Sequence, residues 1–458
     1  MTLIKSISGI RGTIGGQPGD NLTPIDIVKF TAAFATLIQK NNQGKRMKFV
    51  VGRDARISGF MVESLILSTL SGMGIDVVNT GLSTTPTVEM AVVNLKADGG
   101  IIITASHNPK QWNALKLLDG TGEFISAEDG EKVLKFAEDE NINFCDVDEL
   151  GRIENDHTTI DTHIKQILDL GLVDKNIIAK AGFKVAIDAV NSTGGISIPP
   201  LLKALGVKDI IELYCDPTGN FPHNPEPIPE NLGEICKLVI DKKADIGVVV
   251  DPDVDRLALV MENGELFGEE YTLVAVADYI LQSKKGNSVS NLSSTKALRD
   301  VTEKAGGSYT ASAVGEVNVV HKMKENNAVI GGEGNGGVIY PELHYGRDAL
   351  VGIALILTYI AKENITLSEL RLRYNDYFVS KNRIDLTPDM NVKSMYDLVK
   401  SHYSEFPILT IDGVKIDFPD GWVHLRTSNT EPIMRVYAES TSMEKANKYA
   451  KEIIDLIS

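Results

Sequence analysis

Short apolar runs alternate with longer stretches of helical periodicity along most of the chain. Apolar residues recur every three to four positions in residues 27–40, 59–73 and 130–140, which predicts amphipathic helices. Uninterrupted apolar runs, each followed by a polar turn, predict buried strands. These runs are residues 48–51, 100–104, 183–187 and 246–250. The alternation predicts an α/β fold built from several similar units.

The C-terminal part of the chain has a different pattern. Helices are expected at residues 367–377 and 393–401, and a final helix begins at Met443. Between them, short strands are expected at residues 409–411, 414–417, 422–427 and 433–439. Helices followed by neighbouring strands predict an α+β domain. With the breaks in pattern taken as boundaries, we predict domains at residues 1–154, 155–256, 257–365 and 366–458.

Composition narrows the class of protein. The chain has 458 residues, of which 43% are hydrophobic and 24% charged, as in ordinary globular proteins. A formal charge of −16 argues against a nucleic-acid partner, which would require a basic surface. The three cysteines are far apart without metal-ligand spacing, so we expect reduced thiols. Residues 349–361 are too short an apolar segment to span a bilayer, and the first residues lack a signal-peptide pattern. We therefore expect a cytoplasmic protein without a membrane partner.

The strand predicted at residues 100–104 runs directly into the sequence Ala-Ser-His-Asn-Pro, which contains Ser106 and His107. A hydroxyl at the C-terminal end of a buried strand lies where open α/β sheets place their chemistry. Taken alone, the sequence is equally a turn made of good turn residues. Polar loops elsewhere in the chain favour the chemical interpretation.

One of these loops carries carboxylates at alternate positions, Asp251, Asp253 and Asp255, after the strand predicted at residues 246–250. Such oxygens can converge on one Mg²⁺, which takes few protein ligands and completes its shell with water and phosphate oxygens. The alternative is a solvated acidic turn, although clustered carboxylates repel one another without a cation. An EF-hand calcium loop is excluded, because its glycine and distal glutamate are absent. We expect one Mg²⁺ per chain, with an oxygen on Ser106 as a fourth ligand.

A second loop, near the C-terminus, is suited to phosphate. Arginine offers planar bidentate donors to phosphate oxygens, and neighbouring hydroxyls and backbone amides can bind the remaining ones. The alternative is an exposed hairpin with incidental charge. The candidate phosphate ligands are Arg426, Ser428, Asn429, Thr430 and Arg435.

A third loop contains five glycines in residues 331–337, which lets the backbone approach a ligand closely. Glu333 and Asn335 supply its only side chains and are suited to sugar hydroxyls. The apolar run that follows favours a shaped turn over a flexible connector. His344 and Arg347 come next, and we expect them to line the same site.

Cationic residues near the serine complete the set. Lys116 follows Ser106 by ten residues and can return to the same site, although most lysines are solvated. Arg11 and Arg53 are suited to neutralising phosphate charge, and equally to forming structural ion pairs. Together, the loops indicate a phosphoryl-transfer site.

Taken in this order, the loops closely resemble those of the α-D-phosphohexomutase superfamily, which includes phosphoglucomutase, phosphomannomutase and phosphoglucosamine mutase. Residues 104–109 look like its phosphoserine loop, 251–256 its metal loop, 332–337 its sugar loop and 426–430 its phosphate loop. The resemblance covers essentially the whole chain, including residues 219–222 and 229–232. It implies four domains around a central cleft, three of them similar mixed α/β domains and the fourth a C-terminal α+β domain.

The resemblance also implies a reaction. Phosphorylated Ser106 would convert a hexose 6-phosphate to a 1-phosphate, or the reverse, through a bound hexose 1,6-bisphosphate that also serves as activator. Lys116 and Arg256 would act near the transferring group, Lys116 as general acid/base. His107 is a second candidate for the proton transfer, and Arg11 would neutralise charge. Mg²⁺ would bridge the aspartates and the seryl phosphate.

Two departures from the family pattern bear on the substrate and the metal. Pro252 and Val254 stand where many members have glycine, but the carboxylate spacing is kept, so we expect the metal site to be retained. Many bacterial members have serine at the position of Asn335. The asparagine here resembles the archaeal-type branch. We expect glucosamine phosphate as substrate, with mannose or glucose phosphate as the alternative.

Two other functions use similar residues. A metal-dependent sugar phosphatase would share Ser106 and the aspartates, but it has no need of a separate anion loop. A non-enzymatic sugar-phosphate binder would need no seryl nucleophile beside a metal loop. We therefore favour the mutase, as a monomer or homodimer.

Overall fold

The computed structural model describes residues 2–6, 9–42, 45–139, 142–387, 389–428 and 432–457. The chain divides into two compact units. The first comprises Met1–Thr272 and Gly336–Glu369, and the second comprises Leu273–Asn335 and Leu370–Ser458. Both are built from helices packed on sheets, which confirms the predicted α/β class.

The N-terminal sheet of the first unit has the strand order β1-β2-β6-β5-β3-β4-β7. Its strands β5, β3, β4 and β7 run parallel, whereas β2 and β6 pair in the antiparallel sense. β5 is buried along its whole length, which explains its continuous apolar sequence. The strands are β1 (Ile4–Ser6), β2 (Gly9–Thr13), β3 (Lys48–Arg53), β4 (Asp76–Leu82), β5 (Gly99–Ile103), β6 (Trp112–Asp119) and β7 (Ile153–Asn155).

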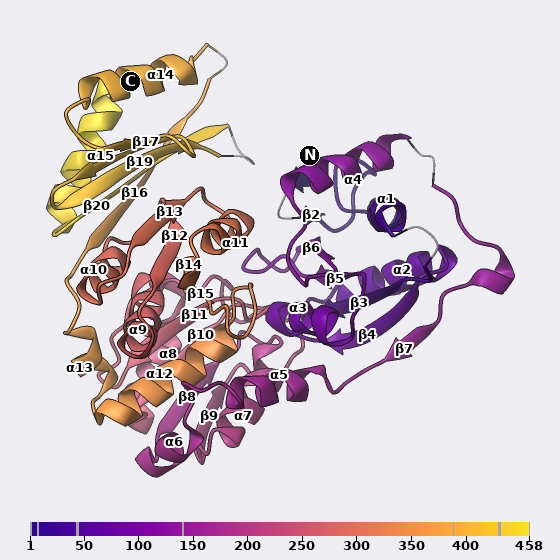
Figure 1. The fold of residues 1–458 in the computed structure, drawn as a ribbon, viewed down its shortest axis with the longest axis horizontal. Helices are drawn as coiled ribbons and strands as arrows, with labels where there is room; N and C mark the ends of the chain where they lie inside the picture. The colour runs from indigo at the N-terminus through magenta and orange to yellow at the C-terminus, as the bar shows by residue number, and fades with distance from the viewer. Residues whose placement is uncertain are drawn as a thin grey trace. The chain divides into compact units, whose positions relative to one another are not determined.

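Helices cover both faces of this sheet (Figure 1). One face packs against α1 (Pro24–Asn41), α2 (Gly59–Gly72) and α4 (Ala127–Asp139), and the other against α3 (Thr85–Asn94). A capping box formed by Thr23 and Asp26 starts α1. The helices predicted at residues 27–40 and 59–73 are confirmed. The one predicted at residues 130–140 begins earlier, at Ala127, and its Glu140 lies outside the described residues.

The second sheet of this unit has the order β11-β10-β8-β9, and only the edge strand β11 is antiparallel. Helix α12 (Ala349–Glu363) is buried through Ile360 and packs against α5, α6 and α7. Its strands are β8 (Lys184–Asp188), β9 (Asp209–Leu213), β10 (Ile246–Val250) and β11 (Leu257–Met261). The first unit also contains the later strand β15 (Gly337–Ile339), which is not part of this sheet. The other helices are α5 (Thr159–Leu168), α6 (Lys175–Ala181), α7 (Gly194–Ala204) and α8 (Gly233–Lys242).

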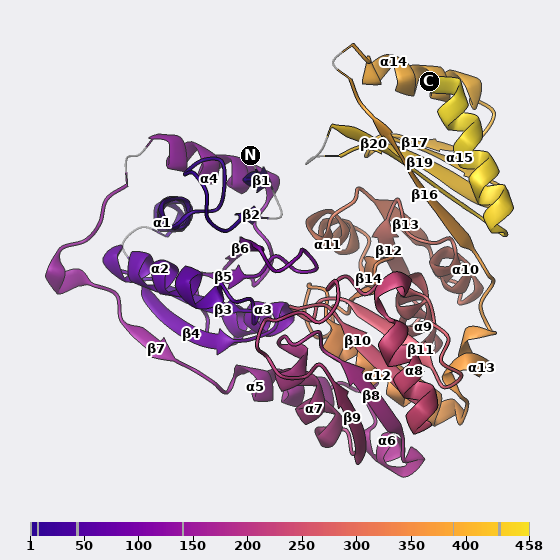
Figure 2. The ribbon, with the colours of Figure 1, turned by 180° about the vertical axis from the view of Figure 1, so that it is seen from behind.

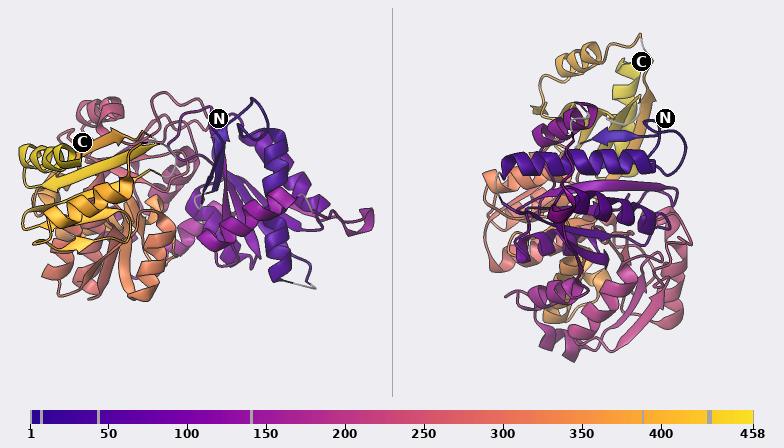
Figure 3. Two further views of the ribbon diagram at one scale, coloured as in Figure 1. Left: turned by 90° about the horizontal axis from the view of Figure 1, so that it is seen from above. Right: turned by 90° about the vertical axis from the view of Figure 1, so that its right-hand side faces the viewer.

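The second unit contains a parallel arrangement of β13, β12 and β14, and an antiparallel sheet ordered β16-β20-β19-β18-β17. Figure 2 shows α14 and α15 beside the antiparallel sheet, and Figure 3 gives two further views. The strands are β12 (Asn287–Asn291), β13 (Tyr309–Ser312), β14 (Ala328–Glu333), β16 (Phe378–Asp385), β17 (Ile408–Leu409), β18 (Val414–Phe418), β19 (Gly421–Thr427) and β20 (Ile433–Ser440). The helices are α9 (Glu269–Ser283, which begins in the first unit), α10 (Ala297–Lys304), α11 (Glu316–Glu325), α13 (Leu367–Arg371, which also begins there), α14 (Val392–His402) and α15 (Met443–Ile457).

Three elements of the C-terminal part differ from the sequence prediction. The strand expected at residues 409–411 is β17, which ends at Leu409. The helix expected at residues 367–377 ends at Arg371, because Tyr374 and Tyr377 donate side-chain hydrogen bonds to Asp278 and Asp300, at 3.0 and 2.6 Å. These distant contacts override local helix propensity. The eight-residue strand β16, which was not predicted, forms by pairing along its full length with β20.

Candidate active site

Ser106 lies in a turn just beyond the end of β5 and is 4% exposed. Its backbone has φ +48°, a left-handed conformation that non-glycine residues rarely adopt. The turn is held from within the sheet: the Ser106 N–H donates to Thr104 Oγ1 at 2.9 Å, and that hydroxyl donates to Asp54 Oδ2 at 2.7 Å. The surrounding structure therefore fixes the serine in a strained position, as is common at functional sites.

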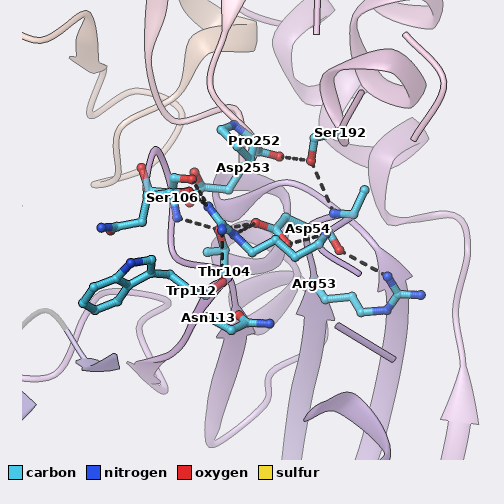
Figure 4. Close-up of polar contacts among 12 residues, drawn as sticks. Arg53, Asp54, Thr104, Ser106, Trp112, Asn113, Ser192, Pro252 and Asp253 are labelled. Atoms are coloured by element: carbon cyan, nitrogen blue, oxygen red, sulfur yellow. Dashed lines mark hydrogen bonds and ion pairs between the residues drawn. The ribbon is translucent and has the colours of Figure 1, made fainter. Parts of the chain in front are cut away.

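Arg56 holds the rest of this loop, a role that the sequence analysis missed. Its side chain is fully buried and pairs with Asp54 at 2.9 Å. The guanidinium donates to the backbone carbonyls of Ser106, Asn108, Pro109 and Trp112. The neighbouring arginine singled out from the sequence, Arg53, instead pairs with Glu63 at 3.2 Å, which is the structural ion pair kept as an alternative. Figure 4 shows the contacts that link Asp54, Thr104 and Ser106.

The three aspartates predicted to bind metal lie together. Asp251, Asp253 and Asp255 are fully buried, and one carboxylate oxygen of each lies within 4.8 Å of the others. Burial, followed by the charges of Asp253 and Asp255, raises the pKa of Asp251 well above its usual range. The Oδ1 atoms of Asp253 and Asp255 are buried without a hydrogen-bond partner among the described residues. Oxygen donors left unsatisfied in this way fit a hard cation, so the cluster can hold a metal ion.

The serine meets this cluster directly, because Ser106 Oγ donates to Asp251 Oδ2 at 2.6 Å. The carbonyl of Pro252 accepts hydrogen bonds from the hydroxyls of Ser192 and Thr193 at 2.7 and 2.8 Å. Figure 4 shows the contact with Ser192. Residues that follow β5 and β10, 145 positions apart in the sequence, are thus in direct contact.

Lys116 also reaches the cluster. It lies on β6 opposite Ile102, and its Nζ is 2.7 Å from Asp253 Oδ2 and 3.4 Å from Asp255 Oδ2. Burial opposes charge on this side chain, but the two carboxylates outweigh burial and raise the pKa of Lys116. It is therefore an ammonium group at neutral pH and can offset negative charge or donate a proton.

Two further residues hold the same carboxylates. Thr85, at the start of α3, donates its hydroxyl to Asp253 Oδ2 at 2.6 Å and its N–H to the Asp253 carbonyl at 2.9 Å. Arg347 donates to Asp255 Oδ2 at 2.7 Å. The sequence analysis did not identify Thr85, since nothing in its local sequence relates it to a loop 168 residues away.

Of the other residues predicted near the serine, Arg11 and Arg256 are cationic and His107 is neutral. Burial, then the nearby charges of Arg256 and Arg11, lower the pKa of His107 to about 2, so its imidazole is neutral. Its Nδ1 is 3.2 Å from Ser106 Oγ. Arg11 donates to Asn108 Oδ1 at 2.7 Å, and the Arg256 backbone N–H donates to Asp251 Oδ1 at 3.2 Å. Positive charge therefore surrounds the serine loop.

In the second unit, Glu333 ends β14 and lies beside Asn291, which ends the adjacent parallel strand β12. The Asn291 amide donates to Glu333 Oε1 at 2.8 Å, and the Gly315 N–H donates to the same oxygen at 3.2 Å. The Gly334 N–H donates to Ser294 Oγ at 3.1 Å. The glycine-rich segment is thus a shaped turn and not a flexible connector. Asn291, which the sequence analysis missed, holds the Glu333 carboxylate in place.

The predicted phosphate loop connects β19 and β20. Arg426 and Arg435 face each other as a cross-strand pair, and Arg426 Nε is buried without a hydrogen-bond partner among the described residues. Like charges directly opposite each other are unfavourable in a sheet unless an anion offsets them. Ser428 is held by its N–H, which donates to the Ile433 carbonyl at 2.9 Å. Asn429 and Thr430 lie outside the described residues.

A series of side-chain hydrogen bonds connects the turn after β12 with strand β19 within the second unit. Ser293 Oγ lies 2.9 Å from Nδ1 of His424, which is on β19 two residues before Arg426. His424 Nε2 donates to the Asp412 carbonyl at 2.7 Å. The Ser293 N–H in turn donates to Asn291 Oδ1 at 2.9 Å. The turn after β12 therefore contacts both the residue that holds Glu333 and the strand that carries Arg426.

His344 belongs to the first unit, whereas Glu333 and Asn335 belong to the second. Its Nε2 is 3.3 Å from Asp348 Oδ2, and its Nδ1 is 3.4 Å from Glu89 Oε2. Burial opposes charge on the ring, but the two carboxylates outweigh burial and raise the pKa of His344 to about 10. Its predicted role in sugar binding stays a prediction.

Comparison with known protein families accounts for nearly the whole chain. Four models described as phosphoglucomutase/phosphomannomutase domains match it in order: alpha/beta/alpha domains I, II and III at residues 3–143, 161–264 and 268–377, and the C-terminal domain at residues 382–456. The chain belongs to the α-D-phosphohexomutase superfamily. The predicted fold class, with three α/β domains and a different C-terminal domain, is confirmed, whereas the domain boundaries stay predictions.

Two curated relatives of this phosphohexomutase span almost its full length. A protein of Thermococcus kodakarensis named phosphoglucomutase/phosphomannomutase is 35% identical, over 97% of this chain and 98% of its own. A Sulfurisphaera tokodaii protein named phosphoglucosamine/phosphogalactosamine mutase is 33% identical, over 98% of each chain. The crystal structure of a phosphoglucomutase/phosphomannomutase family protein from Burkholderia thailandensis matches with a TM-score of 0.84 and 26% identity, over 99% of this chain and 96% of that one.

These comparisons establish the class of enzyme. The phosphohexomutase is an isomerase that acts on phosphosugars, as the sequence predicted. Among the residues that the structure describes, no helix is both long and apolar enough to cross a membrane.

Proposed function

We propose that this phosphohexomutase interconverts glucosamine 6-phosphate and glucosamine 1-phosphate, through a phosphoserine at Ser106 and a bound hexose 1,6-bisphosphate. The main support for a phosphoserine at Ser106 is the 2.6 Å contact between its Oγ and the buried carboxylate cluster. The name of the Sulfurisphaera tokodaii relative supports glucosamine phosphate. The name of the Thermococcus kodakarensis relative supports the alternative, a phosphoglucomutase/phosphomannomutase.

Asp251, Asp253 and Asp255, with an oxygen on Ser106, are the residues that would hold Mg²⁺. A bound Mg²⁺ would offset the negative charge of the transferring phosphoryl group. Lys116 and Arg256 lie at the same carboxylates and supply further positive charge there. In phosphoryl transfer most of the catalysis comes from positioning and charge stabilisation of this kind.

The transfer exchanges one P–O bond for another. The bond from phosphorus to Ser106 Oγ breaks while a bond forms to a sugar hydroxyl, and the hydroxyl proton must reach Ser106 Oγ. We assign this transfer to Lys116, which gives a proton to the departing Oγ and recovers one from the hydroxyl. Its raised pKa makes it a proton donor at rest, whereas the lowered pKa of His107 makes that residue a weak base.

The second unit supplies groups for the remainder of the substrate. Glu333 and Asn335 would bind sugar hydroxyls present in both orientations of the intermediate, and Arg426, Arg435 and Ser428 would bind the phosphate that is not reacting. Asn429 and Thr430 belong to the same prediction. The opposed arginines support an anion site, because a phosphate would offset their repulsion.

A direct assay tests the reaction. Purified enzyme with Mg²⁺ and a trace of the matching bisphosphate is supplied with glucosamine, mannose and glucose 1-phosphates, and kcat/KM is compared. We expect the highest value for glucosamine 1-phosphate. A clear preference for mannose or glucose phosphate would establish the alternative, and free phosphate without isomer would place the enzyme among the phosphatases.

Ser106→Ala tests the mechanism. This variant should lose turnover while calorimetry still detects sugar-phosphate binding, because the proposed sugar and phosphate ligands are unchanged. Thr36→Val is the control, since it removes a hydroxyl on α1 that donates to the Ala32 carbonyl within the same helix. Full activity in Ser106→Ala would refute the phosphoserine.

A further inference from the structure

A second cluster of metal-ligating side chains lies in the first unit, outside the carboxylate cluster described above. His163 from α5, with His344 and Asp348 from the segment before α12, place one ligand atom each within 4.8 Å of the others. His163 Nε2 is 2.9 Å and His344 Nε2 is 3.3 Å from Asp348 Oδ2. His163 and Asp348 are at most 1% exposed. Two imidazoles thus converge on one buried carboxylate oxygen.

Each of these side chains is held by its other polar atom. His163 Nδ1 lies 2.9 Å from Thr87 Oγ1, and His344 Nδ1 lies 3.4 Å from Glu89 Oε2. Asp348 Oδ1 accepts hydrogen bonds from two backbone N–H groups that begin α12, at 2.8 and 3.2 Å. In metal sites the ligands are oriented in this way, with the second ring nitrogen of each histidine on a hydroxyl, carbonyl or carboxylate.

The spacing suits a small tetrahedral cation. Zinc bonds of about 2.0–2.2 Å to nitrogen and oxygen place neighbouring ligand atoms about 3.3 Å apart. The two contacts of Asp348 Oδ2, at 2.9 and 3.3 Å, come close to that separation. Two histidines and one carboxylate are also a frequent protein ligand set for zinc, which then keeps one position for water.

The local charge suits a cation. Glu89 and Asp348 are buried carboxylates, and each has an oxygen within 3.4 Å of a ring nitrogen of His344. Gly346 packs closely against Glu89, since a Cβ at that position would lie 1.9 Å from Glu89 Oε2.

We propose that His163 Nε2, His344 Nε2 and Asp348 Oδ2 bind one Zn²⁺ in a site that ties α5 to the segment preceding α12. Zn²⁺ would take the Nε2 lone pair of each ring, so any proton on that atom would move to Nδ1 or to solvent. The proposal does not depend on the proposed substrate or on the Mg²⁺ site.

Metal content tests it directly. The full chain, without an affinity tag, is dialysed against a chelator, loaded with ZnCl₂ in excess Mg²⁺, desalted and measured by elemental analysis. We expect about one zinc per chain and a rise in Tm. Co²⁺ in place of Zn²⁺ should give the visible absorption of a tetrahedral site. Protein that retains no zinc and shows no shift in Tm would overturn the proposal.

Variants separate this site from adventitious binding. His163→Gln should lose the retained zinc and the Co²⁺ absorption, whereas His157→Gln, at an exposed histidine nearby in sequence, should keep both. Asp253→Asn should keep the zinc, because it alters only the other cluster. Far-UV circular dichroism of each metal-free variant checks its folding. Zinc retained in full by a folded His163→Gln would also overturn the proposal, and the wild-type measurement decides the question if that variant fails to fold.

Discussion

Lys116 contacts Oδ2 of Asp253 and of Asp255, and Arg347 contacts Oδ2 of Asp255. The Oδ1 atoms of these two aspartates have no hydrogen bond among the described residues, and Arg256 Nε lies 4.0 Å from Asp255 Oδ1. The two oxygens of each carboxylate therefore have different surroundings. Under the proposed function, a metal ion held at the Oδ1 atoms would leave the contacts of Lys116 in place.

The lysine can be tested with an uncharged side chain of similar length. Lys116→Met should lower kcat by about 10²–10⁴-fold, the range for loss of a general acid/base, with a much smaller change in the Kd for sugar phosphate. Steady-state kinetics and calorimetry measure the two effects. Lys132→Met, at an exposed lysine on α4, is the control and should be unaffected. A kcat within threefold of wild type would remove Lys116 from the mechanism.

Removing the metal should affect activity and stability together. Chelation should abolish turnover, and adding Mg²⁺ should restore it. The added cation would again offset the negative charge of the three buried carboxylates. Mg²⁺ should also raise Tm in wild type, and the rise should be much smaller in Asp251→Asn. Differential scanning calorimetry with and without Mg²⁺ makes the comparison. An identical rise in the variant would mean that Mg²⁺ binds elsewhere.

At the scale of elements, α3 links the N-terminal sheet to the metal loop. Its first turn binds Asp253 through the Thr85 hydroxyl and N–H, and its later residues Thr87 and Glu89 contact His163 and His344. A single helix thus contacts both of the buried clusters. Its first turn contains no acidic residue, and its contact with Asp253 comes from one hydroxyl and one backbone N–H.

Thr85→Val tests this contact with a side chain of nearly the same shape. Loss of the hydrogen bond to Asp253 should weaken Mg²⁺ binding by roughly 10- to 100-fold, the usual effect of losing a partner of a metal ligand. The Mg²⁺ dependence of kcat measures it, and saturating Mg²⁺ should recover most of the activity. A Mg²⁺ dependence identical to that of wild type would show that the hydroxyl does not position the aspartate.

His424 on β19 gives a prediction about pH. Its burial lowers its pKa to about 4, against 6.5 for the unfolded chain. Between these values the unfolded state binds a proton that the folded state does not, so the free energy of unfolding falls as pH falls. The loss should be about 2 kcal/mol between pH 7 and pH 5. Urea denaturation of wild type and His424→Gln at both values tests this, and parallel losses in the two proteins would refute it.

Helices and strands could be predicted from sequence where the local pattern of apolar residues determines them. The apolar run of β10 ends directly before Asp251, and that of β5 ends three residues before Ser106, so the two loops could be located without a structure. The role of Arg56 could not be assigned, because the backbone carbonyls to which it donates lie 50 or more residues away. The same holds for Asn291, whose role depends on the pairing of β12 with β14.

At the scale of the whole molecule, the chain passes between its two compact units at three places, after Thr272, Asn335 and Glu369. The groups proposed for phosphoryl transfer belong to the first unit, and those proposed for sugar and distal phosphate belong to the second. Under the proposed function, a single substrate must contact residues of both. Ligand binding should therefore restrict their relative motion.

Small-angle scattering can measure this restriction. With glucose 1,6-bisphosphate and Mg²⁺, the radius of gyration should decrease and the distribution of distances should narrow. Calorimetry on the same sample establishes that the ligand is bound. Unchanged scattering at saturating ligand would contradict the expectation. Light scattering on the same samples would decide between the monomer and homodimer that we predict.

The facing pair of Arg426 and Arg435 has a practical consequence for work with this protein. Two like charges across adjacent strands attract small anions from any buffer, and sulfate or phosphate carries more charge than chloride. Storage salts would then compete with the substrate for the same strands. Apparent KM values measured in sulfate would exceed those in chloride at equal ionic strength, so the choice of counter-ion becomes part of any published kinetic constant.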